Sequence, residues 1–322
     1  MLLSLLMGSG FHASLMALLT VLMSFFWGTS NVAGLFIVTF PYFGFVNGYS
    51  AAKLYRFFNG SRWLTMSILA TVFYPAVLFS GYFLVDWIDP GFAEKLFGPE
   101  GISAATFGYL WLFINLPATS FGAYHGFIAD KLTIPTKQSR LLRDIPSQNT
   151  KARRMRTICA SLLPFIAIYL QFGKFSASSF SLVAGQKNQI QSIDSVFVAQ
   201  SASDFDTSQW ATILFFCLAA MMYLVIIAEV AIVQTYLQLC EEDYKWQWPS
   251  LLYGLVPACM LFTLALVLRI LFGRSSQSSA MAQLLSMILV CGTVALIGAS
   301  VAFVASFKFN QYLYSKVQRN LD

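Results

Sequence analysis

The chain of 322 residues is 57% hydrophobic and only 11% charged. Soluble domains carry about 25% charged residues, so a soluble fold of this composition would leave a large apolar surface facing water. The apolar runs are about 20 residues long and lack the alternation of β-barrel strands, which favours helices because each helix pairs its own backbone groups in lipid. The composition predicts an all-α, polytopic integral membrane helical bundle.

Apolar runs predict about eight transmembrane helices in one domain over residues 1–322. In chain order they are 11–28, 32–54, 63–88, 103–127, 157–175, 209–238, 250–272 and 280–307. The connections between them are short, except 128–156 and 176–208. Prolines inside these spans each remove a helical hydrogen bond and predict kinks; they are Pro75, Pro117, Pro164 and Pro257.

The distribution of basic residues predicts the orientation of the spans. Of the 20 Lys and Arg residues, 15 fall on the side that carries both termini and the 128–156 connection. Basic residues collect in cytosolic loops, so we expect both ends of the chain to be cytosolic and 89–102 and 176–208 to be lumenal. Both ends on one side require an even number of spans.

The net charge of +6 does not indicate nucleic-acid binding, because the basic residues lie in loops between apolar spans rather than on one soluble face. We expect membrane lipids and no nucleic acid as partners. The five cysteines lack CxxC spacing and lie in or beside predicted spans, which predicts buried apolar residues rather than a disulfide framework. They are Cys159, Cys217, Cys240, Cys259 and Cys291.

Glu229 is an acidic residue well inside a predicted span. A carboxylate in the bilayer costs about 2.5–3.5 kcal/mol or more, so it is expected to face the bundle interior, a partner or water. One interpretation is a proton, cation or cargo-contact site. The other is a protonated carboxyl group that holds the bundle together through a hydrogen bond to another span. Candidate partners are Asn115, Tyr169, Gln171 and Tyr253.

Two glycine pairs have the four-residue spacing that lets helices approach closely. Gly44 and Gly48 lie in the second predicted span, and Gly122 and Gly126 lie in the fourth. Such pairs are common in membrane bundles and predict helix packing. With Asn115 and Glu229 they are also our candidates for the recognition of another helix in the membrane.

An acidic cluster, Glu241–Tyr244, follows the sixth span on the expected cytosolic side. The helix dipole makes negative charge unfavourable at a helix C-terminus, so the cluster is not expected to form a cap. It either meets the basic 131–156 segment, which needs counter-charges or anionic headgroups, or forms a solvated turn.

Little in the sequence indicates catalysis. The only two histidines are His12 and His125, which are far apart in the chain. HExxH, GxSxG and P-loop motifs are absent, and no His/Cys cluster has the spacing of a metal site. We therefore expect no enzyme activity, no cofactor and no metal.

Several segments resemble the transmembrane 9 superfamily, the nonaspanins. They are the turn Gly48–Trp63, the span end Leu116–Phe127, the proline-flanked loop Pro135–Gln148 and the stretch Ala228–Trp248. The last is the most specific, because a span that carries a glutamate runs into Leu-Cys-x-Glu-Asp-Tyr-x-Trp-x-Trp. The family-motif residues on the cytosolic side are then Glu242, Asp243, Tyr244, Trp246 and Trp248.

The chain also departs from the family pattern. Nonaspanins have a large lumenal N-terminal domain and a first span, and this chain begins after both, so we expect a fragment or a shortened relative. Family members often end in a lysine-containing signal that the COPI coat reads. Asn320 stands where that lysine is expected, which makes COPI binding doubtful.

The resemblance implies a role in sorting or escorting other membrane proteins in the Golgi and endosomes. Recognition of their spans would be lateral, through close-contact glycines and polar residues. Two other functions stay open. A structural subunit of a larger membrane complex fits the missing lumenal domain and the missing lysine. A channel or transporter using Glu229 would need a continuous polar path across the bundle.

Overall fold

The computed structural model describes residues 1–27, 35, 39–89, 108–132, 150–184, 207–272 and 277–319. All of its regular secondary structure in these residues is helical, which confirms the all-α fold. The α-helices are α1 (Leu2–Trp27), α3 (Gly44–Phe57), α4 (Trp63–Ile88), α7 (Leu116–Ile128), α8 (Thr150–Ala184), α10 (Thr207–Cys240), α11 (Gln247–Phe272) and α12 (Gln277–Arg319).

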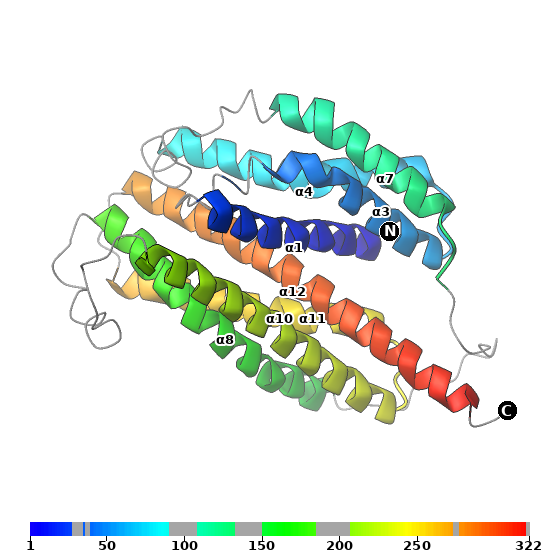
Figure 1. Ribbon diagram of the computed structural model, residues 1–322. Helices are drawn as coiled ribbons and strands as arrows, with labels where there is room; N and C mark the ends of the chain where they lie inside the picture. The colour runs from blue at the N-terminus through cyan, green and yellow to red at the C-terminus, as the bar shows by residue number, and fades with distance from the viewer. Residues whose placement is uncertain are drawn as a thin grey trace.

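The helices form two groups joined by α1 and α12 (Figure 1). On one side of α1 lie α3, α4 and α7, and on the other lie α8, α10 and α11. α12 packs against α11 and α10 in one group and against α4 in the other, and it also contacts α1. The start of α1 and the end of α12 lie at the same end of the bundle. We call this the basic end, because Arg56, Arg153 and Arg156 lie there.

Five of the described helices contain a segment long and apolar enough to cross a membrane. Their ranges are Leu2–Thr20, Trp63–Ile88, Ala220–Cys240, Gln247–Val267 and Met281–Lys316. This confirms a polytopic membrane protein. The count of eight spans stays a prediction, since parts of the predicted spans 32–54 and 103–127 lie outside the described ranges, as do the side chains at the end of 157–175.

The second predicted span, 32–54, is not one continuous helix. A 3₁₀ turn at Phe40–Phe43 (η1) precedes α3, which begins at Gly44. Pro41 lies in this turn and has no N–H to donate, so an α-helix cannot continue through it undisturbed. The fourth span, 103–127, is also irregular, because a π-helical turn at Trp111–Asn115 (η2) precedes α7 and Pro117 follows directly.

Three other helices are longer than predicted. α1 begins at Leu2 instead of residue 11, α8 covers Thr150–Ala184 instead of 157–175, and α12 ends at Arg319 instead of 307. Apolar runs mark only the part of a helix that matches the bilayer, while the helix continues through polar residues that do not break it. The 43 residues of α12 span about 65 Å, twice the roughly 30 Å hydrocarbon core.

The cysteines do not all lie in the interior. Cys291 is buried, whereas Cys159, Cys240 and Cys259 are exposed on the outer surface of the bundle. The prediction of buried cysteines is wrong for these three, because a lipid-facing surface accepts the same apolar side chains as the core. The four described cysteines are free thiols, and the side chain of Cys217 lies outside the described residues.

The orientation of the bundle stays a prediction with a direct test. Asn59 lies in the turn after α3, where its side chain accepts a hydrogen bond from Lys131 at 2.6 Å. It begins the sequon Asn59-Gly-Ser. If the basic end is cytosolic, the glycosylation machinery never meets it, and glycosidase treatment will not change the mobility of the expressed chain. A shift that Asn59→Gln abolishes would invert the orientation.

Candidate functional site

The predicted glycines pack α3 against α7. A Cβ atom at Gly48 would lie 2.0 Å from the Thr119 backbone oxygen, and one at Gly122 would lie 2.1 Å from that of Phe45. Across the same contact, a Cβ atom at Gly126 would lie 2.3 Å from the Tyr49 backbone oxygen, and one at Gly44 would lie 2.6 Å from the Thr119 hydroxyl oxygen. All four glycines are therefore used inside the chain. The proposal that they contact another protein's helix is wrong, because α3 and α7 already occupy each other's glycine surfaces.

A second close contact, between α11 and α12, was missed in the sequence. A Cβ atom at Gly254 would lie 2.1 Å from the backbone carbon of Gly298. Neither glycine has another glycine four residues away, but Gly254 with Ala258 and Gly298 with Ala302 fit the broader pattern of small residues four apart, which could have indicated the contact. Gly254 is the single glycine of α11, and the other glycine of α12, Gly292, lies six residues before Gly298.

Asn115 is buried at the two irregular turns. Its side-chain amide donates to the Pro41 backbone oxygen at 3.3 Å, and its own oxygen accepts from Thr119 at 3.2 Å. His12 of α1 bonds the adjacent Phe40 oxygen at 3.1 Å. A broken helix exposes carbonyl groups that lipid cannot satisfy, and these side chains supply donors. Asn115 therefore supports the fold, and it is not accessible to a partner helix.

Glu229 is exposed on the outer surface of α10. Among the residues that the structure describes, no side chain forms a hydrogen bond or ion pair with it. The expected network with Asn115 and Tyr253 is wrong, since both of these are buried, 1% and 4% exposed, and Glu229 faces away from the interior. Of the other expected partners, Tyr169 is exposed and the side chain of Gln171 lies outside the described residues. A transport path inside the bundle through Glu229 is contradicted for the same reason.

Glu229 lies within a continuous exposed stripe. Exposed side chains recur every three or four residues along α10, which places them on one side of the helix. We call these residues the α10 outer face: Leu218, Met222, Val225, Glu229, Val233 and Tyr236. Glu229 is the single ionisable carboxyl group of this face. It lies one residue from the midpoint of the candidate span Ala220–Cys240.

Because it faces outward, Glu229 should not stabilise the isolated chain. We expect Glu229→Leu to leave the thermal midpoint in detergent unchanged or to raise it, since it removes a polar group from an apolar surface. Glu229→Gln should also leave it unchanged. A buried interhelical hydrogen bond would instead make the Leu variant less stable by about 0.6–2 kcal/mol. Tryptophan fluorescence during heating, compared across the three proteins, separates the two outcomes.

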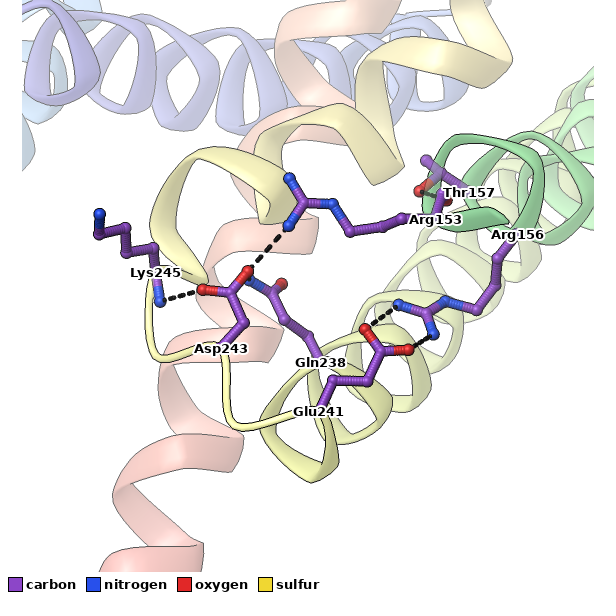
Figure 2. Close-up of polar contacts among 7 residues, drawn as sticks. All are labelled: Arg153, Arg156, Thr157, Gln238, Glu241, Asp243 and Lys245. Carbon is purple, nitrogen blue, oxygen red and sulfur yellow. Dashed lines mark hydrogen bonds and ion pairs between the residues drawn. The ribbon is translucent and has the colours of Figure 1, made fainter. Parts of the chain in front are cut away.

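The acidic cluster at the basic end forms ion pairs with the start of α8 (Figure 2). The Asp243 carboxylate is nearly buried and accepts hydrogen bonds from three donors. They are the Arg153 guanidinium at 2.8 Å, the Gln238 amide at 2.9 Å and the Lys245 backbone N–H at 3.0 Å. The cluster therefore meets the basic segment that precedes the fifth span, and the alternative of a solvated turn is excluded for Asp243.

Arg156 forms the second ion pair. Its guanidinium donates two hydrogen bonds to the Glu241 carboxylate, one of them at 3.2 Å, in the bidentate arrangement of Figure 2. This bonding raises the pKa of Arg156 above its ordinary value, so the arginine stays charged. The bidentate pair of Arg156 with Glu241 and the single hydrogen bond of Arg153 to Asp243 together restrict the orientation of α8 relative to the end of α10.

The end of α10 is closed by backbone hydrogen bonds despite the unfavourable dipole. The N–H of Asp243 bonds the Gln238 oxygen, and the N–H of Glu242 bonds the Leu239 oxygen, which is the Schellman arrangement. Glu242 adopts a φ of 61° at the position where glycine is usual. The expectation that this cluster forms no cap is wrong. The bonds hold Glu241 and Asp243 in place to meet the two arginines.

The positive φ of Glu242 gives a further prediction. Glu242→Gly should raise the free energy of unfolding by up to about 1 kcal/mol, because glycine adopts this conformation without a Cβ clash. The gain is reduced by the extra freedom of glycine in the unfolded chain. Denaturant unfolding beside Glu242→Ala, which keeps the clash and removes the same charge, measures it. Equal stabilities of Glu242→Gly and Glu242→Ala would show that the backbone at this position is not strained by a Cβ atom.

The aromatic residues of the motif divide into two kinds. Trp246 packs against Phe303 and Phe307 of α12 with ring centroids 5.5 and 6.2 Å apart. Tyr244 and Trp248 are exposed, 41% and 54%, at the basic end. Exposed tyrosine and tryptophan at a helix end are typical of the membrane–water interface. The motif thus contributes an internal packing residue, an ion-pair acceptor and interface residues.

No group of three metal-ligating side chains occurs in the described parts of the chain. The expectation of no enzyme, no metal and no cofactor stays an expectation, because parts of the chain lie outside those ranges. The C-terminal residues around Asn320 also lie outside them, and doubtful COPI binding likewise stays a prediction.

Comparison with known proteins extends over nearly the whole chain. The family model described as endomembrane protein 70 matches residues 1–182 and 192–281. Transmembrane 9 superfamily member 2 of Rattus norvegicus is 27% identical over 99% of this chain and 45% of its own length. Member 9 of Arabidopsis thaliana is 26% identical over 97% of this chain and 45% of its own length. No solved structure matches the chain.

The matched region corresponds to less than half of these relatives, so their whole-protein activities do not transfer directly to it. The match nevertheless includes the Glu229 helix, the ion-pair cluster and the glycine contact between α3 and α7. On the strength of the family model and the coverage of the relatives, the chain belongs to the endomembrane protein 70 family, the transmembrane 9 superfamily of multi-pass membrane proteins.

Proposed function

We propose that this protein binds other membrane proteins laterally, within the bilayer, and takes part in sorting or escorting them in Golgi and endosomal membranes. The description of the matching family as an endomembrane protein supports an internal membrane as its place of action. Lateral binding is proposed because the Glu229 side chain is exposed on the outer surface of α10. A carboxyl group on the outer surface of a transmembrane helix is costly in lipid and is satisfied by a partner.

The α10 outer face is the surface that makes this contact. The candidate glycines and Asn115 are used within the chain, which leaves Glu229 as the one intramembrane candidate that a partner can reach. Binding of this kind involves no chemical turnover. It requires an exposed face, a polar anchor in that face and a bundle rigid enough to present both.

Co-purification tests the proposal. Tagged wild-type chain and Glu229→Leu are extracted from internal membranes in a mild detergent, and the associated proteins are identified and quantified. We expect several membrane proteins in substoichiometric amounts with wild type and their loss with Glu229→Leu. The matched control is Val72→Leu, a substitution on the exposed surface of α4.

The result also separates the rival function. A structural subunit would retain one stoichiometric set of partners, and that set would contradict a sorting role. Membrane proteins that associate equally with wild type and Glu229→Leu would show that the α10 outer face is not the binding surface.

A further inference from the structure

We infer that the basic end of α3, α4 and α7 binds the headgroup of an anionic phospholipid that carries an additional phosphate group, the phosphatidylinositol phosphate class. The inference is independent of lateral binding at α10, because it concerns the other group of helices and a lipid instead of a protein. It comes from four cations that we call the α3–α7 basic cluster: Lys53, Arg56, Arg62 and Lys131.

Hydrogen bonds join the turn after α3 to the end of α7 and hold two of these cations in place. Arg56 donates to the backbone oxygens of Phe127 and Ala129, the second at 2.7 Å. Lys131, two residues after Ala129, donates to the side-chain oxygen of Asn59 at 2.6 Å. The two positive charges are therefore fixed near one another, at one corner of the bundle.

The other two cations of the cluster lie beside this corner. Lys53 is three residues before Arg56, on the same side of α3, and it donates to the Tyr49 hydroxyl at 3.1 Å. Arg62 is exposed three residues after Asn59, directly before α4. The first turn of α4 has no side-chain cap, so its N–H groups add a partial positive charge to that of the cluster.

The charges of the cluster are oriented but not neutralised. Lys53, Arg56 and Lys131 have a hydroxyl, backbone carbonyls and an amide as their hydrogen-bond acceptors in the described parts of the chain, and all of these are neutral. The arginines of α8 differ, since each of them is paired with a carboxylate. The segment 133–149 adds more positive than negative charge wherever it lies, because its ionisable residues are Lys137, Arg140, Arg143 and Asp144.

The surroundings of the cluster have the layout of a phospholipid. The rings of Trp63 and Tyr124 are 5.9 Å apart at the same end of the helices, as is typical of the membrane–water interface. Further into the membrane, the exposed rings of Phe45 and Phe121, 6.0 Å apart, lie on the outer surface of α3 and α7. Cations thus lie at headgroup depth above an apolar surface along which acyl chains can pack.

The amount of charge favours a headgroup with more than one phosphate. Asp130, which is exposed beside Lys131, offsets one of the four cations and leaves a net charge of about +3. A phosphate monoester carries about 1.5–2 negative charges, so a phosphatidylinositol monophosphate, which also has a diester, matches this charge. Phosphatidylserine has about one net negative charge. The exposed guanidinium of Arg62 also suits bidentate binding of a phosphate group.

Native mass spectrometry of the full chain in a mild detergent tests the inference. The protein is titrated with phosphatidylinositol monophosphate, phosphatidylserine and phosphatidylcholine that have the same acyl chains. We expect the first to bind about tenfold more tightly than phosphatidylserine. Soluble inositol phosphate should compete at least about tenfold less well than the lipid, since it lacks the acyl chains. Equal competition would assign the site to free phosphate compounds and refute a lipid site.

Variants assign the binding to the cluster. Lys53→Gln, Arg62→Gln and Lys131→Gln each remove a charge and keep a hydrogen-bonding side chain, and each should weaken binding of the phosphoinositide about fivefold. The matched control is Lys245→Gln, which removes an exposed cation at the same end of the other helix group and should retain full binding.

Two results would overturn the inference. One is equal binding of phosphatidylserine and the phosphoinositide by the wild type, which would show general attraction to negative charge. The other is a loss of binding in Lys245→Gln as large as in Arg62→Gln, which would show that any cation at the basic end serves equally. Arg62→Gln is decisive even if the other variants unfold, because the Arg62 side chain is exposed.

Discussion

Replacing Gly122 with alanine is expected to lower the free energy of unfolding by about 1–3 kcal/mol or more. The new Cβ atom would lie 2.1 Å from the backbone oxygen of Phe45, well inside van der Waals contact. Because the obstructing atom belongs to the backbone, no change of rotamer relieves the clash, and α3 and α7 must move apart. Gly48→Ala meets the Thr119 backbone oxygen from the other side and should have a similar effect.

A matched control exists on α12. Gly292 is also a helical glycine in a membrane span, but a Cβ atom there would have nothing within 4 Å. Gly292→Ala should therefore be neutral or slightly stabilising, since alanine is the better helix former. Thermal unfolding of the variants in one detergent measures the difference. Equal midpoints for Gly122→Ala and Gly292→Ala would contradict the described α3–α7 contact.

The second large effect is expected at Asp243. Asp243→Ala should cost about 2–3 kcal/mol, because its carboxylate accepts hydrogen bonds from Arg153, Gln238 and the Lys245 backbone. The Gln238 side chain is 1% exposed and would keep an unpaired amide in the interior. This loss of stability is at the lower end of what breaking a buried ion pair costs, because the Arg153 side chain is 42% exposed and water can solvate it.

Glu242→Ala is the control for this prediction. Glu242 is the neighbour of Asp243 and its side chain is exposed, so the variant removes the same charge without breaking a buried contact. We expect it to change stability by less than about 0.5 kcal/mol. A double-mutant cycle with Arg153→Ala then isolates the coupling between Arg153 and Asp243. Coupling near zero would show that the ion pair of Figure 2 does not hold α8 to the end of α10.

The sequence predicts some of these features well and others poorly, for physical reasons. The predicted span 63–88 coincides with α4, Trp63–Ile88, because its apolar run begins and ends with the helix. The predicted span 32–54 wrongly continued as one helix through Pro41. Hydropathy measures only how apolar a residue is and carries no information about the N–H group that proline lacks. α12 continues past its apolar part, since lysine and glutamine there are compatible with a helix.

The direction in which a side chain faces is harder to predict in a membrane protein. In water the polar side of a helix faces out, but in lipid the surface is as apolar as the interior. α10 is apolar around most of its circumference, so its sequence does not indicate which side of the helix carries Glu229. The four-residue glycine spacing correctly predicted close contact. The partners, α3 and α7, come only from the three-dimensional arrangement.

The ion pairs, too, could be predicted only in part from the sequence. Opposite charges near residues 131–156 and 241–244 made contact between the two segments one of two alternatives, beside a solvated turn. The sequence did not distinguish which acid meets which arginine, because that depends on where α8 begins. Its start at Thr150 places Arg153 and Arg156 on the helix, three residues apart, so both face the end of α10.

Site-specific photo-crosslinking along α10 tests lateral recognition most directly. A photoreactive residue is placed in turn at Val225 and Val233, on the α10 outer face, and at Ile227 and Ala231, which are fully buried. Val72 on α4 serves as an exposed control away from this face. Lateral recognition predicts adducts with other membrane proteins at the two outer positions, at least several-fold above those at the other three, and their loss when Glu229→Leu is added. Adducts at Val72 as abundant as at Val225, or unchanged by Glu229→Leu, would contradict it.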